Sequence, residues 1–328
     1  MKEECLSDQQ SILDLNDLAP ISVSVYTRLW HFQQCIESLA NNKLAQYSKL
    51  YVFSDAPKPG DEEKVLAVRE YAKKIKGFKE VILKFQQEND RKRNVTDARE
   101  IPLNEHGKMI RMEDDNIVGP HALQFINEGL VLYKDDPIII SITGYSPPIG
   151  QNKYVHGDAY LSYFFSAWVF GVWKEKKYLQ FLSLEKPYAD MISSGLLSRV
   201  KSIHPKLPDA LKRMDEGTHR AGDQKLSYFM IKHGMYQIKP VQSMVRNIGN
   251  DGSGVHCGVS KKFDIDACQT SLNVRLKQIK YVPKIDRLQY RYFHGSRLRS
   301  SVVLFVKEIL SDNVYKKLLA FKGNAKIF

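Results

Sequence analysis

Short apolar runs alternate with amphipathic stretches through the first half of the chain, and few folds accommodate this alternation. Short apolar runs typical of strands occupy 21–26, 50–53, 81–85, 109–112 and 137–142, and the first of them is rich in β-branched residues. Stretches with apolar residues three or four apart, typical of helices, occupy 32–39, 62–75 and 121–133. The polar stretch 86–107 is expected to be a loop with a short helix. Together these elements predict an α/β fold with a mostly parallel central sheet flanked by helices.

Three adjacent acids, Glu113, Asp114 and Asp115, directly follow the fourth of these strands. Because like charges repel, packing alone gives no reason to gather them there. Arg28 and Asp55 follow two other predicted strands, and parallel sheets bind ligands beyond the carboxyl ends of their strands. Mg²⁺ and Mn²⁺ take oxygen ligands, usually one or two carboxylates plus substrate phosphates. The pattern favours a metal and nucleotide site over the simpler alternative, a solvated turn.

The composition is that of a globular protein in a reducing compartment. Of the 328 residues, 43% are apolar and 26% are charged, which suits an ample core. The four cysteines show no CxxC spacing, so free thiols are expected and a zinc site is not. Residues 1–20 contain five acids, unlike a secretory signal, and 160–173 is too short to span a bilayer. A cytoplasmic location is therefore expected.

The positive charge is concentrated near the C-terminus. The formal net charge is +12, and residues 271–328 contain 13 Lys or Arg against three acids, a balance of +10. Such a segment attracts nucleic acid, an anionic membrane surface or a phosphate-bearing acceptor. Within it, 301–322 has the pattern of a basic amphipathic helix, which suits the cytoplasmic face of a membrane. A solvated basic face, packing on the main domain, or a dimer contact are the alternatives.

Six segments, in their order and spacing, resemble nucleotide-sugar glycosyltransferases of the GT-A fold. The resemblance is strongest to bacterial sugar transferases of surface-polysaccharide gene clusters, and distant to the N-acetylglucosaminyltransferase that begins complex N-glycans. Two stretches depart from the family pattern: 88–97 replaces an Asn-x-Gly-Leu-type donor segment, and 168–173 lacks Gly-Trp pairs. The six segments are PISVSVYTR at 20–28, LYVFSDAPK at 50–58, MEDD at 112–115, ISITGYSPP at 140–148, the tryptophan segment 168–174, and VRNIGNDGSGVHC at 245–257.

The resemblance implies a Rossmann-like GT-A catalytic domain over residues 20–280, preceded by a lead segment, 1–19. Within the catalytic domain, the nucleotide-sugar half covers about 20–150 and the acceptor half about 151–280. The basic C-terminal helical extension is expected to begin near residue 281 and to run to 328.

The resemblance also implies roles at the donor site. Asp115 is expected to bind the Mn²⁺ or Mg²⁺ that bridges the donor's two phosphates and acts as a Lewis acid. Glu113 and Asp114 are expected to accept hydrogen bonds from sugar or ribose hydroxyls. Asp55 is expected to contact the base or ribose, and its simpler role is to cap a turn. Arg28 is expected to line the same cleft with Tyr26, and its simpler role is that of an exposed arginine at a helix start.

An inverting transfer needs a base on the acceptor side, because the attacking hydroxyl must lose its proton. Asp223 precedes the predicted helix 224–233 and stands where related enzymes carry this base, so it is the expected catalytic residue. Asp190 and Asp215 are its rivals. The simpler role for Asp223 is a helix N-cap.

An aromatic stretch and a glycine-containing loop complete the expected site. At least one of Trp168 and Trp173 is expected to line the acceptor pocket, although aromatic stretches are more often part of a core. The loop 249–254 is expected to fold over the diphosphate as a lid, with His256 touching phosphate or metal. A plain turn is the alternative.

The expected function is a metal-dependent, inverting transfer of a hexosyl or N-acetylhexosaminyl group in surface-polysaccharide biosynthesis (lipopolysaccharide, O-antigen or capsule). The donor is a nucleotide sugar, with a UDP-sugar favoured, and the acceptor a glycan or lipid-linked glycan at the inner face of the plasma membrane. Two other functions are the alternatives.

The first is a nucleotidyltransferase, which usually has a glycine-rich loop after the first strand, whereas 26–30 has no glycine. The second is a non-catalytic protein that binds nucleic acid or another polyanion through the basic C-terminal segment and its aromatic residues. Nucleic acid is not the favoured partner, because this function would leave the acidic triplet unexplained. Those aromatics are Tyr281, Tyr290, Tyr292 and Phe293.

Overall fold

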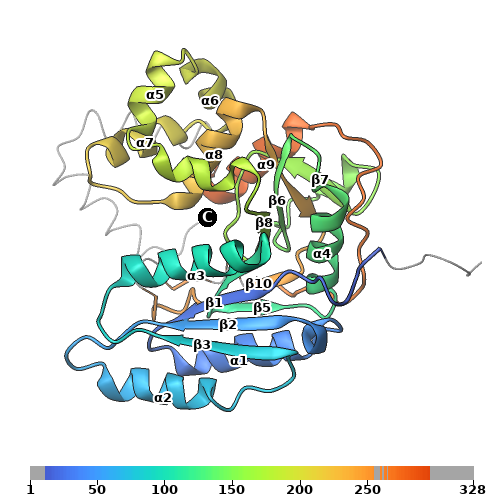
Figure 1. Cartoon of the computed structure of the whole chain (residues 1–328). Helices are drawn as coiled ribbons and strands as arrows, with labels where there is room; N and C mark the ends of the chain where they lie inside the picture. Colours follow the sequence, from blue (N-terminus) through green and yellow to red (C-terminus); the bar gives the residue numbers. More distant parts are fainter. Residues whose placement is uncertain (1–11, 255–258, 261, 264, 296–328) are drawn as a thin grey trace, which may run out of the picture.

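An eight-stranded sheet organises the part of the chain that the computed structural model describes, residues 12–254, 259–260, 262–263 and 265–295 (Figure 1). The strand order is β3-β2-β1-β4-β8-β6-β9-β7, and only β8 and β7 run antiparallel to their neighbours. The predicted fold class, α/β with a mostly parallel central sheet, is confirmed. The strands are β1 (Ile21–Val25), β2 (Lys49–Ser54), β3 (Glu80–Phe85), β4 (Lys108–Glu113), β6 (Ile139–Thr143), β7 (Ala159–Ser162), β8 (Phe170–Trp173) and β9 (Tyr236–Pro240).

Helices cover both faces of this sheet. In Figure 1, α1 and α2 lie on one side of β1–β3 and α3 lies on the other. Helices α5 to α8 form a second group that packs around the antiparallel half. The α-helices are α1 (Leu29–Ala40), α2 (Glu62–Ala72), α3 (Arg91–His106), α4 (Ala122–Leu132), α5 (Pro187–Ser193), α6 (Leu197–Ile203), α7 (Leu207–Asp215), α8 (Gly222–His233) and α9 (Pro283–His294); the 3-10 turns are Ala45–Tyr47, Gln151–Lys153 and Lys177–Ser183.

The first strand and helix show how the pattern of apolar residues sets this arrangement. Alternate residues of β1, Ile21 and Val23, are fully buried in the largest core cluster. On α1, Phe32, Cys35 and Leu39 share one face and pack into the same cluster. Burial of each such side chain contributes about 1.5–3 kcal/mol relative to exposure. Because α1 packs against β1, the carboxyl end of β1 is fixed in place. Arg28 follows this end, just before α1 begins.

Helix α3 corrects one expectation from the sequence. The stretch 86–107 was expected to be a loop with a short helix, yet α3 has 16 residues. It begins at a side-chain cap, since Asp90 accepts a hydrogen bond from the Arg93 N–H at 3.0 Å. It also contains Pro102, which has no N–H to offer the Ala98 carbonyl. The Ser22 hydroxyl of β1 donates to that carbonyl instead, at 2.5 Å, and so joins α3 to the sheet.

A small second sheet brings together residues far apart in the sequence. Strand β5 (Asn116–Val118), directly after the acids, pairs antiparallel with β10 (Val245–Asn247). In this register Asn247 lies opposite Asn116. The pairing carries the loop after β10 onto the end of β4.

Residues 281–295 pack into the main body of the molecule. Asp286 of α9 is buried and accepts hydrogen bonds from the Ser162 hydroxyl at 2.6 Å and the Tyr163 N–H at 3.0 Å. The predicted lead segment up to residue 11 and the predicted amphipathic helix 301–322 lie outside the described residues. Over the described ranges, every helix is too short or too polar to cross a membrane.

Candidate functional site

The acidic triplet leaves the sheet at the carboxyl end of β4. Glu113 is the last residue of the strand and lies in register with Ser24 of β1. The backbone then turns at Asp114 and Asp115 before it enters β5. Both aspartates are buried, with exposed fractions of 5% and 6%, whereas Glu113 is exposed. Two buried carboxylates in adjacent positions require compensating partners.

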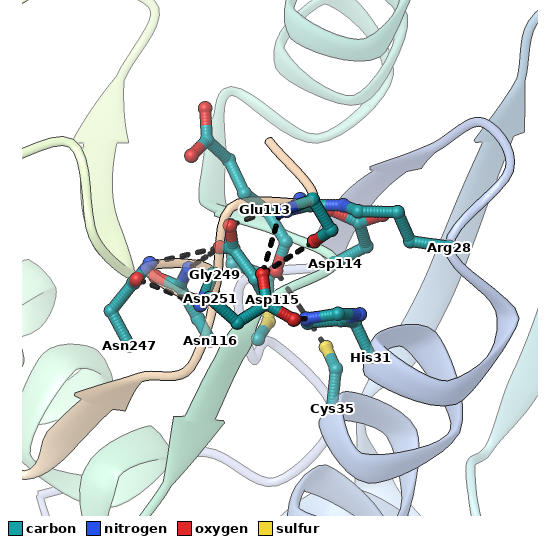
Figure 2. Close-up of polar contacts among 12 residues, drawn as sticks. Arg28, His31, Cys35, Glu113, Asp114, Asp115, Asn116, Asn247, Gly249 and Asp251 are labelled. Atoms are coloured by element: carbon teal, nitrogen blue, oxygen red, sulfur yellow. Dashed lines mark hydrogen bonds and ion pairs between the residues drawn. The ribbon is translucent and has the colours of Figure 1, made fainter. Parts of the chain in front are cut away.

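Arg28 supplies the compensating charge. Its guanidinium forms a bidentate ion pair with Asp114, with Nε 3.3 Å from Oδ2 and Nη2 bonded to Oδ1 (Figure 2). The same Nη2 lies 3.0 Å from Asp115 Oδ2. Burial raises the pKa of Asp114, and the neighbouring Arg28 opposes that rise. One arginine, held at the start of α1, therefore holds both aspartates in place.

Asp115 is the most firmly positioned acid of the three. Its Oδ1 accepts hydrogen bonds from the side-chain amides of Asn116 at 2.6 Å and Asn247 at 2.9 Å. Its backbone carbonyl accepts the Ile248 N–H at 2.9 Å. Gly249 lies so close that a Cβ there would be 2.0 Å from Asp115 Oδ2. The loop after β10 thus folds directly over this carboxylate, and only glycine fits at position 249.

A second acid lies on the same loop. Asp251 accepts hydrogen bonds from the Ser253 N–H at 2.9 Å and hydroxyl at 2.6 Å, which lower its pKa to about 2. Its other oxygen, Oδ2, lies 3.1 Å from Nε2 of His31 on α1. Figure 2 shows Asp251 and His31 beside Asp115. The segment 245–257 is part of the family resemblance, but the sequence alone predicts no role for Asn247 or Asp251.

Glu113 points away from the Arg28 group in Figure 2. Although the residue is open to solvent, partial desolvation of its carboxyl group and the Asp115 charge raise its pKa to about 7. Arg111, two residues earlier on β4, donates to the Ser24 hydroxyl at 2.7 Å, and Glu113 acts as its nearby countercharge. Arg111 was missed from the sequence because it lies within a strand, where alternation alone does not separate a site residue from a surface residue.

Asp55 lies buried just beyond β2, where it joins two loops. Its Oδ1 accepts hydrogen bonds from the backbone N–H groups of Ala56 at 2.9 Å and Asp90 at 3.0 Å. Its Oδ2 accepts the side-chain amide of Asn89 at 3.2 Å. A carboxylate oxygen has two lone pairs, so Oδ2 keeps one acceptor position for a ligand.

Tyr26 follows β1 and braces the neighbouring loop. Its hydroxyl donates to Asp61 at 2.9 Å and accepts the Lys58 N–H at 2.9 Å. Burial is the largest of the causes that raise the pKa of this phenol, so it stays a neutral donor. Tyr26 and Asp55 therefore hold the loops next to the triplet, and Arg28 holds the triplet itself.

Asp223 lies in the first turn of α8 and is exposed, with Ala221 as the N-cap residue. Although the residue is open to solvent, the surrounding chain partly desolvates its carboxyl group and raises the pKa. The two rival acids are engaged in structural contacts. Asp190 binds Lys232 Nζ at 2.6 Å, and Asp215 accepts backbone N–H groups at the start of α5. Asp223 remains the candidate base.

The two tryptophans lie in different environments. Trp168 is partly buried, with Tyr145 edge-on at 4.4 Å and Phe263 edge-on at 5.4 Å between ring centroids. Trp173 is buried and its indole N–H donates to the Leu130 carbonyl at 3.0 Å. It pairs with Lys108 at the opposite end of β4 from the acids, so the structure does not bring it to the triplet. His256 lies outside the described residues.

The carboxylates of this site could bind a hard divalent cation only if substrate oxygens supplied the remaining ligands. Nowhere in the described ranges do three His, Cys, Asp or Glu side chains converge as metal ligands. Two carboxylates belong to this site: Asp115 lies beside Gly249, and Asp251 is two residues further along the same loop. Carboxylates with phosphate oxygens are the usual ligands of Mg²⁺. The arrangement fits a cation bound together with a diphosphate rather than a metal held by protein alone.

The fold and site define an α/β protein with an acidic, amide-rich centre at the carboxyl edge of its parallel strands. No family model and no curated protein matches the sequence. Several solved structures are similar to it. One is the mannosyltransferase PcManGT from Pyrobaculum calidifontis in complex with GDP-Man and Mn²⁺, which is 13% identical with a TM-score of 0.33, over 51% of this chain and 49% of that chain.

Two structures of S. aureus TarS 1-349 are also similar. One is 11% identical with a TM-score of 0.39, over 69% of this chain and 58% of that one. The other, in complex with UDP-GlcNAc, is 12% identical with a TM-score of 0.34, over 51% of this chain and 48% of that one. The chain thus spans about half the length of the solved chains it matches.

Proposed function

We propose that this protein is a glycosyltransferase that uses a nucleoside-diphosphate sugar, a UDP-sugar in the first instance, as its donor. One observation carries the proposal: Asp115 is held at the carboxyl edge of the sheet by Arg28, Asn116 and Asn247, under a loop that needs Gly249. Burying a carboxylate costs stability even when it is paired, and such costly placement is typical of functional sites. The sequence resemblance to GT-A enzymes supplies the reaction class.

In this proposal Asp115 and Asp251 hold a Mn²⁺ or Mg²⁺ ion together with the donor's phosphates. The ion would act as a Lewis acid that stabilises charge on the departing nucleoside diphosphate. The protein itself contributes fixed geometry. Because Asn116 and Asn247 occupy Oδ1 of Asp115, Oδ2, which also contacts Arg28 Nη2 at 3.0 Å, is the oxygen that would contact a cation.

The donor would lie across the loops that follow β1, β2 and β4. Asp55 Oδ2 has an acceptor position for a base or ribose group, and Tyr26 fixes the adjoining loop. Glu113 points away from Arg28 and so is available to accept a sugar hydroxyl. Asp114, bidentate to Arg28, would act mainly by keeping that guanidinium beside the phosphates.

Asp223 would serve as the base of an inverting transfer. A carboxylate whose pKa is raised by its surroundings takes a proton from a hydroxyl more readily than an ordinary one. Desolvation has this effect on Asp223. The acceptor would be a glycan or lipid-linked glycan of a surface polysaccharide, with Trp168 at the acceptor side and the basic C-terminal segment at the inner membrane face.

A thermal-shift panel tests the donor class. UDP-, GDP-, dTDP- and CMP-sugars are each added with and without Mn²⁺, because a ligand that binds the native state raises the melting temperature by mass action. A metal-dependent shift with one nucleotide class is expected, and it should disappear in Asp115→Asn. The control is Asp209→Asn, an exposed acid in the first turn of α7. The proposal fails if no nucleotide sugar shifts the wild type, or if Asp115→Asn responds as the wild type does.

A further inference from the structure

A cavity lined by none of the triplet residues lies between α6, α9 and the end of β7. Its volume is about 590 Å³. Two of its lining residues are arginines from different helices, Arg199 of α6 and Arg287 of α9, and two are tyrosines, Tyr163 and Tyr281. The remaining lining residues are Ser202, Ile203, Pro283 and Asp286.

The one acid of this cavity has its charge directed into the protein. Asp286 Oδ1 accepts from Ser162 at 2.6 Å and Gln289 at 2.8 Å, and Oδ2 accepts from the Tyr163 N–H at 3.0 Å and the Tyr281 hydroxyl at 2.9 Å. Four donors fill the four lone pairs of a carboxylate. Asp286 therefore has no lone pair left to accept a hydrogen bond from either arginine.

The two arginines keep their positive charge for a ligand. Both are exposed, and no acid of the described ranges forms an ion pair with either. Arg199 Nη2 donates to the Tyr163 hydroxyl at 3.3 Å, and that hydroxyl donates to Tyr236 at 2.9 Å. One guanidinium is thus placed by a neutral chain of hydroxyls, which leaves its other N–H groups free to bind an anion.

A neighbouring cavity of about 310 Å³ extends the same chemistry. Tyr281 and Pro283 line both cavities and form a shared wall. Beyond that wall the lining includes Lys277 and Lys280, again with aromatic side chains, among them Tyr160. Cations therefore occur on both sides of one tyrosine, spaced along two adjoining hollows.

We propose that these two cavities form a binding site for an acidic saccharide, whose anionic groups pair with Arg199 and Arg287 on one side of Tyr281 and with Lys277 and Lys280 on the other. Guanidinium groups bind carboxylate or phosphate through paired hydrogen bonds. Two lining tyrosines reach the surface, Tyr281 (partly exposed) and Tyr154 (exposed), and their rings offer apolar faces to a sugar ring. The site is separate from Asp115 and does not rest on the proposed transfer reaction.

Calorimetric titration of the full chain at low salt tests this site. The probes are tetragalacturonic acid, maltotetraose, inorganic phosphate and a single-stranded oligonucleotide of equal charge. Tetragalacturonic acid is expected to bind, and maltotetraose to bind at least about tenfold more weakly, because it lacks the anionic groups. Arg287→Gln should weaken the acidic saccharide about tenfold, and Arg199→Gln by a similar factor.

The matched control is Arg291→Gln, one turn further along α9 and exposed, which should leave affinity within about twofold. The proposal is overturned if Arg287→Gln and Arg291→Gln bind the acidic saccharide equally, or if maltotetraose binds as tightly. It is also overturned if inorganic phosphate alone, or the oligonucleotide, binds more tightly with the same dependence on Arg287. Each readout is direct binding, so it holds whether or not the protein transfers sugar.

Discussion

Arg28 forms ion pairs with both buried aspartates of the candidate site. Arg28→Ala leaves both carboxylates without their counter-ion, so we expect a loss of about 3 kcal/mol in the free energy of unfolding at pH 7. The loss should shrink at pH 5, because a protonated carboxyl needs no counter-ion. Urea denaturation at both pH values measures this. Arg213→Ala, an exposed control on α7, should cost under about 0.5 kcal/mol; equal losses would contradict the prediction.

Gly249 is fixed by its contact with Asp115 rather than by its backbone angles. In Gly249→Ala the new Cβ would lie 2.0 Å from Asp115 Oδ2, so the loop or the carboxylate must move. We expect a stability loss of about 1–3 kcal/mol together with loss of the metal-dependent thermal shift. Gly222→Ala is the comparison, since nothing lies within 4 Å of its Cβ position. If both variants melt alike, the close contact has no energetic weight.

Glu113 makes stability depend on pH. Its folded pKa is raised to about 7 from 4.5, so between these values the native state binds more protons than the unfolded state. Stability contributed by this group therefore falls as pH rises from about 4.5 to 7. Glu113→Gln should flatten that slope and be slightly more stable than the wild type at pH 8, by about half a kcal/mol or less because the side chain is exposed.

Denaturation at pH 5 and pH 8 measures the Glu113 effect, with Glu216→Gln, an exposed residue after α7, as control. A steeper fall in stability for Glu113→Gln than for the wild type would show that the sign is wrong.

At the scale of single elements, the spacing of apolar residues predicted those helices and strands whose position is set by that spacing. Helices α1, α2 and α4 and the first four strands follow from apolar spacing, and each lies within a few residues of its expected position. The full length of helix α3 was not predicted, because many of its residues are charged and it contains Pro102. Its stability comes from the Asp90 cap and from Ser22 of β1, a contact between residues 76 positions apart. No local pattern encodes that contact.

The contact between β1 and α3 can be tested by a double-mutant cycle. Ser22→Ala removes the donor to the Ala98 carbonyl and leaves a buried acceptor unpaired, so we expect a loss of about 1–3 kcal/mol. In a Pro102→Ala background the new N–H can bond that carbonyl within the helix, so Ser22→Ala should cost less. Chemical denaturation of the four proteins gives the coupling energy. Equal costs in both backgrounds would mean that Ser22 stabilises the fold in another way.

For the whole molecule, the sequence predicted β1 to β4 and β6, but not β7, β8 and β9 or their pairing. The acids could be placed at the carboxyl edge of the sheet because the strand ends could be placed. The loop after β10 could not, because its position depends on the pairing of Asn247 with Asn116 across 130 residues. The same reason separates Trp173 from the site, since its position depends on the antiparallel register with Lys108. Non-local pairing therefore sets the part of the site that sequence reasoning left incomplete.

Substitution of Asp286 tests whether α9 unfolds in the same cooperative transition as the sheet. The three tryptophans, Trp30, Trp168 and Trp173, all lie before the predicted boundary near 281, so their fluorescence reports on the main domain alone. Asp286→Ala leaves its four donors without their shared acceptor, and we expect a loss of about 3 kcal/mol or more.

Because Asp286 bonds to Ser162 and Tyr163, this loss should lower the denaturation midpoint seen by the tryptophans, in one transition that coincides with the loss of helical circular dichroism. Lys284→Ala, exposed on the same helix, should leave the midpoint unchanged. If Asp286→Ala instead left the tryptophan midpoint in place and added a separate transition, α9 would belong to an independent extension. The coincidence of the two probes therefore decides whether α9 unfolds together with the sheet or as part of a separate extension.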